Sequence, residues 1–144
     1  MITAVDTNIL LDLFGPDAVF GPASANAVRV ALAEGTLVAC EVVWAEAAGV
    51  FSSSAAAEDG LSRLGLGFSP VTADTAIEAG RVWRAYRKRR GPRSRVAADF
   101  LIGAHALCQA DRLLTRDQGF YRSYFSGLSV LSPIRVKAES RQTE

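Results

Sequence analysis

Soft metal ligands are scarce in this sequence, which has two cysteines and one histidine. That is too few for a zinc centre built from thiolates and imidazoles. Cys40 and Cys108 belong to no motif and lie among apolar residues, so we expect two buried, reduced thiols. No apolar run approaches the roughly 20 residues that cross a bilayer. The first residues also lack the basic lead-in of a secretory signal. These absences predict a cytoplasmic protein that does not span a membrane.

Acidic residues are missing from one long stretch of the chain. None lies between Glu78 and Asp99, although half of the 16 basic residues fall there. The net charge of +1 hides this patch, which favours a polyanionic partner such as RNA. The alternative is a solvated helix end. The residues that we expect to contact RNA are Arg87, Lys88, Arg89, Arg90, Arg93 and Arg95.

Short apolar runs alternate with helical patterns along the 144 residues. The runs predict strands at 2–5, 37–40, 68–71, 112–115 and 128–131. Helical patterns lie at 24–34, after residue 40, after Thr72 and after Ser94, whereas residues 52–67 predict only a short helix with weak ends. This alternation is typical of an α/β protein, a three-layer α/β/α sandwich around a short, mainly parallel, five-stranded sheet. We expect residues 1–133 to form a single domain and residues 134–144 a polar, flexible tail.

Four acids follow strands of this predicted sheet. Asp6 directly follows the first strand and Asp117 closely follows the fourth, while Glu46 and Asp99 lie in helices. Each has a simpler explanation. Asp6 could cap a helix, Asp99 could interact favourably with the dipole at a helix N-terminus, and Asp117 could belong to a turn. Glu46 lies in an otherwise apolar helix, where a carboxylate is expensive to bury unless it is paired or metal-bound.

Together the four acids predict a metal site. Parallel sheets bind ligands at the carboxyl ends of their strands, where strand order reverses, so the fold would bring these acids together. Clustered carboxylates repel and raise one another's pKa values, and a divalent cation relieves that conflict. Oxygen-only ligands indicate Mg²⁺, with Mn²⁺ as the alternative. Such an ion can orient water for attack on a phosphodiester.

Four segments resemble the PIN-domain nucleases, specifically the VapC-type toxins of bacterial toxin–antitoxin pairs. They are VDTNILLDL, WAEAAGVF, AADFLIGAHAL and LLTRDQGF, and their order and spacing cover nearly the whole chain. The resemblance implies a Mg²⁺-dependent endoribonuclease that forms a homodimer and is held inactive by a cognate antitoxin. It also implies catalytic acids, of which three would bind metal and Glu46 would be a ligand or orient the attacking water. The implied set is Asp6, Glu46, Asp99 and Asp117, supported by Asn8 and Thr115.

Two other functions stay open. An aspartyl-phosphate phosphatase would also place an acid after the first strand, but it needs a second acid where Asn8 stands. It also needs a lysine near the late acids, and the only lysines are Lys88 and Lys137. A non-catalytic RNA-binding or assembly module with a PIN-like fold is the other alternative.

Overall fold

The central sheet has five strands, all parallel, in the order β3-β2-β1-β4-β5. The computed structural model describes residues 1–15, 19–89 and 95–133. Each strand lies at or beside its predicted run, although β3 is shorter than expected because Pro70 has no N–H to continue the ladder. The strands are β1 (Ile2–Val5), β2 (Thr36–Ala39), β3 (Gly67–Phe68), β4 (Arg112–Leu114) and β5 (Val130–Leu131).

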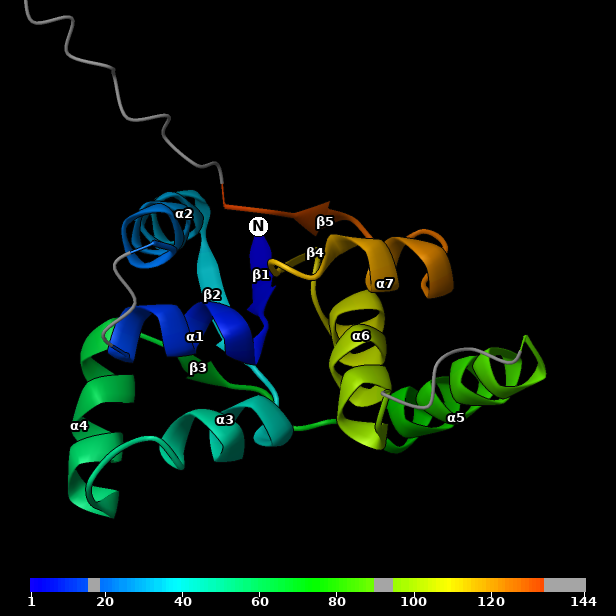
Figure 1. Ribbon diagram of the computed structural model, residues 1–144, viewed down its shortest axis with the longest axis horizontal. Helices are drawn as coiled ribbons and strands as arrows, with labels where there is room; N and C mark the ends of the chain where they lie inside the picture. The colour runs from blue at the N-terminus through cyan, green and yellow to red at the C-terminus, as the bar shows by residue number, and fades with distance from the viewer. Residues whose placement is uncertain (16–18, 90–94, 134–144) are drawn as a thin grey trace, which may run out of the picture.

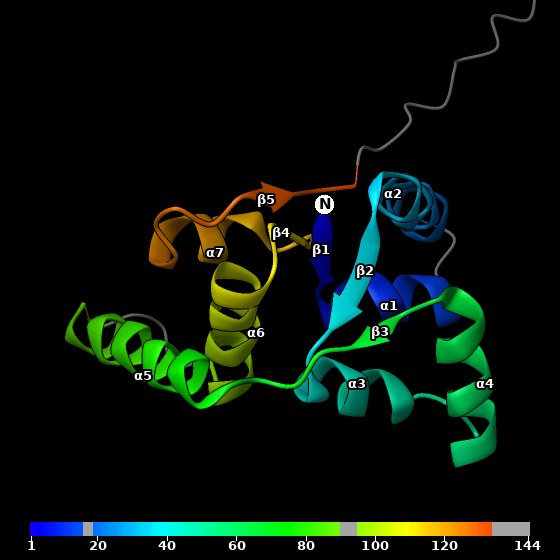
Figure 2. The same cartoon turned by 180° about the vertical axis from the view of Figure 1, so that it is seen from behind.

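Helices cover both faces of this sheet, as the α/β/α prediction requires. Helices α1, α2 and α4 lie to one side and α5, α6 and α7 to the other, while α3 lies at the carboxyl end of the sheet (Figures 1 and 2). Their bounds are α1 (Thr7–Phe14), α2 (Gly21–Glu34), α3 (Glu41–Ala48), α4 (Ser54–Leu64), α5 (Ala73–Lys88), α6 (Ala97–Gln109) and α7 (Gln118–Tyr124).

Helix α4 corrects the prediction of weak helix ends in residues 52–67. Ser53 caps its N-terminus, accepting a hydrogen bond of 3.1 Å from the backbone N–H of Ala56. Gly65 ends it in the left-handed region with φ of 77°, where glycine has no Cβ penalty. A serine cap and a glycine stop therefore define a helix that apolar periodicity alone underestimates.

An aromatic core fixes α6 and α7 relative to each other. Phe100 on α6 is fully buried and lies 5.5 Å from the ring of Phe120 on α7. Gly103 on α6 permits Phe125, the residue after α7, to approach the helix closely. A Cβ at position 103 would lie only 2.4 Å from the Phe125 ring. The N-terminal ends of α6 and α7 are thereby held in place, and both ends bear residues of the predicted site.

Two other expectations can be compared with the structure. Cys40 is buried, but Cys108 is exposed, so the prediction of two buried thiols is wrong for Cys108. Its apolar sequence neighbours point to other sides of α6, and apolar flanks do not establish burial on a helix. In the described ranges, no helix is both long and apolar enough to cross a membrane. The predicted flexible tail, residues 134–144, lies outside those ranges.

Candidate active site

The strand order reverses between β1 and β4. From β1 the chain continues to β2 and β3 on one side, then returns to β4 on the other. Val5 of β1 lies opposite Leu114 of β4, and the N–H of Asp6 donates to the carbonyl of Leu114 at 2.9 Å. Asp117 is three residues beyond the end of β4. The structure thus places Asp6 and Asp117 at the edge where an α/β sheet binds ligands.

Asp6 is buried, with 6% of its surface exposed. Its Oδ1 accepts a hydrogen bond of 2.7 Å from the N–H of Thr7, so it does cap α1. Its Oδ2 accepts from the hydroxyl of Thr115 at 2.7 Å and from Nδ2 of Asn8 at 3.4 Å. Capping therefore explains one oxygen only, and the second is held by a network that a helix cap does not need.

Thr115 connects Asp6 to the loop that precedes α7. Its side chain is fully buried, and its Oγ1 accepts the N–H of Asp117 at 3.0 Å while donating to Asp6. Asn8 reinforces this connection, since its Oδ1 accepts the N–H of Arg116 at 3.2 Å. The two residues predicted as supporting thus fix the position of the loop.

Replacing Thr115 with valine should lower the free energy of unfolding by about 1–3 kcal/mol, the penalty for leaving buried polar groups unsatisfied. The backbone N–H of Asp117 would lose this acceptor, and Oδ2 of Asp6 would keep only its longer hydrogen bond from Asn8 among those to that oxygen described above. Thr115→Ser keeps the hydroxyl and should lose less. Urea unfolding of both variants measures this, and equal stability of Thr115→Val and wild type would show that the hydroxyl is dispensable.

Asp99 lies at the start of α6, where its Oδ2 accepts the N–H of Val96 at 3.2 Å. It therefore stabilises the helix N-terminus, as its simpler explanation requires. It also lies beside the site, because Nη1 of Arg95 is within 4.0 Å of both Asp99 and Asp117. Burial raises the pKa of Asp6 most, and the charge of Asp99 adds to that rise. Asp99 thus combines a helix-capping contact with a place in the acidic group.

Tyr121 is a member of the site that the sequence analysis missed. Burial raises the pKa of its hydroxyl above the ordinary value, and the charges of Asp6, Asp99 and Asp117 raise it further. The protonated hydroxyl hydrogen-bonds to Asp6. Tyr121 therefore contacts Asp6 and lies near enough to Asp99 and Asp117 for their charges to act on its hydroxyl. The available signal was its spacing, four residues beyond Asp117 and one turn along α7.

Glu46 is connected to this group through the first turn of α1. Its Oε1 accepts the hydroxyl of Thr7 at 2.9 Å, and Thr7 also donates its N–H to Asp6. The side chain of Glu46 is exposed, so the expectation of an acid that is expensive to bury is wrong. The apolar residues beside it in sequence lie on other sides of α3.

Arg95 lies among the acids, although the sequence placed it with the basic residues expected to contact RNA. Its Nη1 is 2.5 Å from Oδ2 of Asp117 and 4.0 Å from Oδ1 of Asp99. Its guanidinium lies over the ring of Phe120, 4.2 Å from the centroid. The hydrogen bond with Asp117 and the neighbouring charges raise the pKa of Arg95, which stays cationic.

The donor set suits a hard divalent ion, although its arrangement is incomplete. Carboxylate oxygens are preferred ligands of Mg²⁺ and Mn²⁺, and a cation beside Asp6 would offset the raised pKa of that buried acid. Within the part of the chain that the structure describes, no three His, Cys, Asp or Glu side chains are arranged to hold a metal. Asp117 is paired with Arg95 instead.

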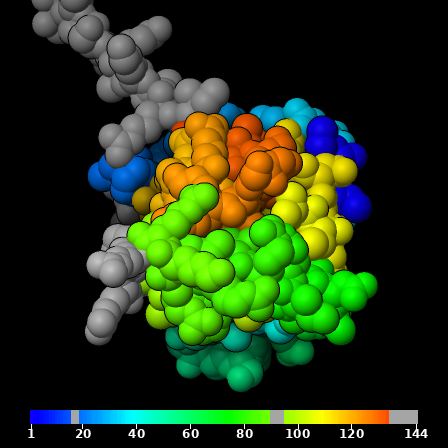
Figure 3. Space-filling model, turned by 90° about the vertical axis from the view of Figure 1, so that its right-hand side faces the viewer, coloured from blue at the N-terminus to red at the C-terminus, as the bar shows by residue number. Residues whose placement is uncertain are grey.

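The basic end of α5 lies on the face formed with α7 (Figure 3). Arg87, Lys88 and Arg89 are exposed. Arg89 lies over the ring of Tyr124 on α7, 5.6 Å from its centroid, and α7 begins next to Asp117. This face therefore connects part of the predicted RNA-binding set to the acids. Arg90 and Arg93 lie outside the described residues.

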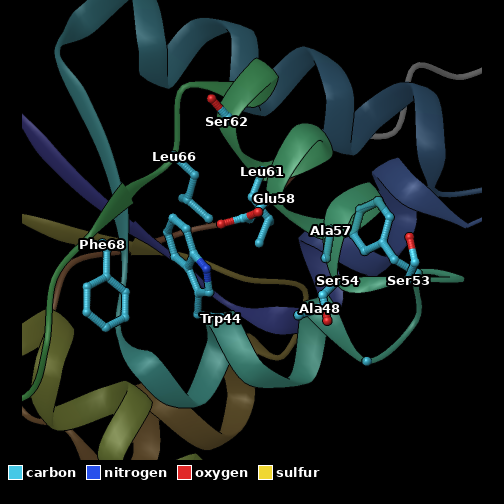
Figure 4. Close-up of a pocket in the computed structure, with 12 residues that line it drawn as sticks. Trp44, Ala48, Ser53, Ser54, Ala57, Glu58, Leu61, Ser62, Leu66 and Phe68 are labelled. Atoms are coloured by element: carbon cyan, nitrogen blue, oxygen red, sulfur yellow. The ribbon is translucent and has the colours of Figure 1, made fainter.

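A separate hollow of about 900 Å³ lies between α3 and α4. Trp44 and Phe68 meet edge to face at 5.3 Å in its wall, and Leu61 and Leu66 line it too (Figure 4). None of the four predicted catalytic acids is among the residues that line it. The hollow is mainly apolar and is distinct from the acidic site.

Comparison with known proteins agrees with this geometry. VapBC2 from Rickettsia felis, bound to a promoter DNA fragment, superimposes with a TM-score of 0.73 at 18% identity, covering 92% of this chain and 98% of that chain. VapBC-1 from nontypeable Haemophilus influenzae gives 0.69 at 20%, with 92% and 98% covered. FitAcB from Neisseria gonorrhoeae gives 0.66 at 19%, with 94% and 100% covered. A comparison with curated proteins found no relative. A PIN-domain profile matches residues 3–126, and the chain therefore belongs to the PIN-domain family.

Proposed function

We propose that this protein is a divalent-metal-dependent endoribonuclease and the toxin of a bacterial toxin–antitoxin pair. One observation supports this most. Thr115 links Asp6 to Asp117 and Arg95 contacts both Asp117 and Asp99, at the strand-order reversal of a PIN domain. Acids gathered at that place are the ligands a phosphodiester-cleaving metal site needs.

Each residue then has a defined task. Asp6, Asp99 and Asp117 would hold Mg²⁺ or Mn²⁺, which supplies positive charge to the reacting phosphate and lowers the pKa of water. Thr115 fixes the position of Asp6 relative to the loop that carries Asp117. The exposed carboxylate of Glu46 can accept a proton from the attacking water.

The basic face of α5 would hold the RNA chain. Its exposed cations can pair with phosphates that the acids would otherwise repel. Helix α7 joins the two regions, because Asp117 lies at its N-cap position and Tyr124, its last residue, contacts Arg89. Seven residues of helix span about 10 Å, less than two nucleotides of extended RNA. A strand bound along α5 could therefore reach the acids.

Replacing Arg87 and Arg89 with glutamine should weaken RNA binding and reduce the slope of log affinity against log salt by about 1.4, or about 0.7 for each lost phosphate contact. The matched control replaces Arg29 and Arg63, on α2 and α4, with glutamine. Fluorescence anisotropy with single-stranded RNA at several salt concentrations measures both slopes. Equal slopes for the two double variants would exclude this face as the RNA site.

The proposal is tested by incubating the purified, antitoxin-free protein with total cellular RNA. Cleavage should require Mg²⁺ or Mn²⁺ and stop in excess EDTA. Sequencing the new ends would give the RNA and the site that are cut. Full cleavage in EDTA would contradict the mechanism, and binding without cleavage would favour a non-catalytic RNA-binding module.

The phosphatase alternative fits less well. Asn8, which stands where that chemistry needs a second acid, donates to Asp6. A covalent phosphoryl adduct trapped on Asp6 would nevertheless establish that chemistry.

The partners follow from the same proposal. The solved structures of similar fold include VapBC proteins and a toxin–antitoxin complex from Klebsiella pneumoniae. We therefore propose a cognate protein antitoxin for this chain, together with a homodimer. Co-expression with the product of a neighbouring small gene should yield a stable complex that no longer cleaves RNA. Light scattering of the free protein should give twice the mass of one chain.

A further inference from the structure

Arg95 occupies the place between two of the proposed metal ligands. It precedes α6, and its Nη1 lies 2.5 Å from Asp117 and 4.0 Å from Asp99. The Phe120 ring lies against its guanidinium. A permanent positive charge is therefore already bound where the acidic group would receive a cation.

Oδ2 of Asp117 accepts the hydrogen bond from Arg95. A divalent ion bound to the same carboxylate would lie close to the guanidinium, and the repulsion between the two positive charges would favour displacement of the arginine side chain. About a quarter of the Arg95 side chain is exposed, so displacement can move its charge into water without crossing the core. Since arginine remains cationic at any physiological pH, its charge would oppose the metal throughout that range.

We infer that Arg95 is a built-in competitor of the metal, which holds Asp117 and Asp99 in the metal-free protein and lowers their affinity for a divalent ion. This inference rests on the proposed function, because it concerns regulation of the same site. It explains why acids suited to a metal do not form a three-ligand group within the described residues. The protein would then become active only at metal concentrations that overcome the arginine.

The competing explanation is a structural ion pair that fastens the Asp117 loop to α6. The two explanations predict opposite signs. If Arg95 competes with the metal, its removal raises the metal affinity. If Arg95 only forms a structural ion pair, its removal loosens Asp117 and lowers the metal affinity. Metal binding without RNA therefore separates them, and no activity measurement is needed.

The test compares wild type with Arg95→Gln in a Mn²⁺ titration followed by electron paramagnetic resonance at constant ionic strength. We expect the variant to bind Mn²⁺ about tenfold more tightly, within the usual range for coupling between two binding events. Arg89→Gln is the matched control, since Arg89 also lies over an aromatic ring of α7 but forms no ion pair with an acid in the described part of the chain. Its Mn²⁺ affinity should change less than twofold.

The possible outcomes of this Mn²⁺ titration distinguish the inference from the proposed function. Equal or weaker Mn²⁺ binding by Arg95→Gln, with wild type still binding, would overturn the inference and leave the proposed nuclease intact. No Mn²⁺ binding by either protein would overturn both. If the variant does not fold, the Arg95 side-chain nitrogen signals of wild type are followed by nuclear magnetic resonance during Mg²⁺ addition. They should shift as the Asp117 hydrogen bond breaks, and unchanged signals at saturation would overturn the inference.

Discussion

Replacing Asp6 with asparagine is expected to reduce RNA cleavage by about a hundredfold or more, the usual loss when one group that stabilises the transition state is removed. The amide oxygen of asparagine can still accept the Thr7 N–H and cap α1. The fold should therefore survive, while the negative charge that would bind the metal is lost. Initial cleavage rates at saturating Mg²⁺ measure the effect.

The matched control for this variant is Asp59→Asn on α4. Asp59 is an exposed acid that pairs with Arg63 one turn away, and its replacement should leave cleavage unchanged. Thermal unfolding should show that Asp6→Asn is folded. Wild-type activity in Asp6→Asn would rule out the proposed role of Asp6.

Replacing Arg116 with methionine is expected to lower the free energy of unfolding by about 3 kcal/mol, because it leaves a buried charge without its partner. Asp12 is 4% exposed, and Arg116 binds both of its oxygens, at 2.8 and 3.0 Å. Ser24 donates a further hydrogen bond to Asp12, at 2.7 Å. Methionine retains most of the packing of the arginine stem, so the measured loss reports the ion pair. Urea denaturation gives the difference directly.

A second substitution provides the control. Asp12→Asn in the Arg116→Met background removes the unpaired charge, so the double variant should regain much of the lost stability. A double variant no more stable than Arg116→Met would show that the loss does not come from the unpaired charge of Asp12. Because Arg116 lies between Thr115 and Asp117, the single variant should also disturb the site.

Much of the fold could be predicted because its signals are local. Apolar runs placed the strands to within a few residues, and Asp6 and Asp117 were placed at the sheet edge because they follow β1 and β4. The parallel α/β/α architecture followed from the alternation of strands and helices. Helix α4 was underestimated because its stability depends on caps at Ser53 and Gly65.

The contacts within the site could not be predicted, because they depend on residues far apart in the chain. Arg95 is 22 residues from Asp117, and Arg116 is 104 residues from Asp12. The periodicity of a helix or strand therefore predicts neither ion pair. The basic run placed Arg95 among the residues expected to contact RNA, whereas Arg95 packs against Phe120 and pairs with Asp117. The exposure of Glu46 likewise depends on which side of α3 meets the rest of the protein.

The most direct test of the proposed metal site is anomalous scattering from crystals of the free protein grown with Mn²⁺. We predict a peak about 2 Å from carboxylate oxygens of Asp6 and Asp99, with Asp117 turned toward the ion. A saturating Mn²⁺ concentration that gives a peak only elsewhere on the molecule, or none, would contradict the proposal that these acids form one metal-dependent nuclease site.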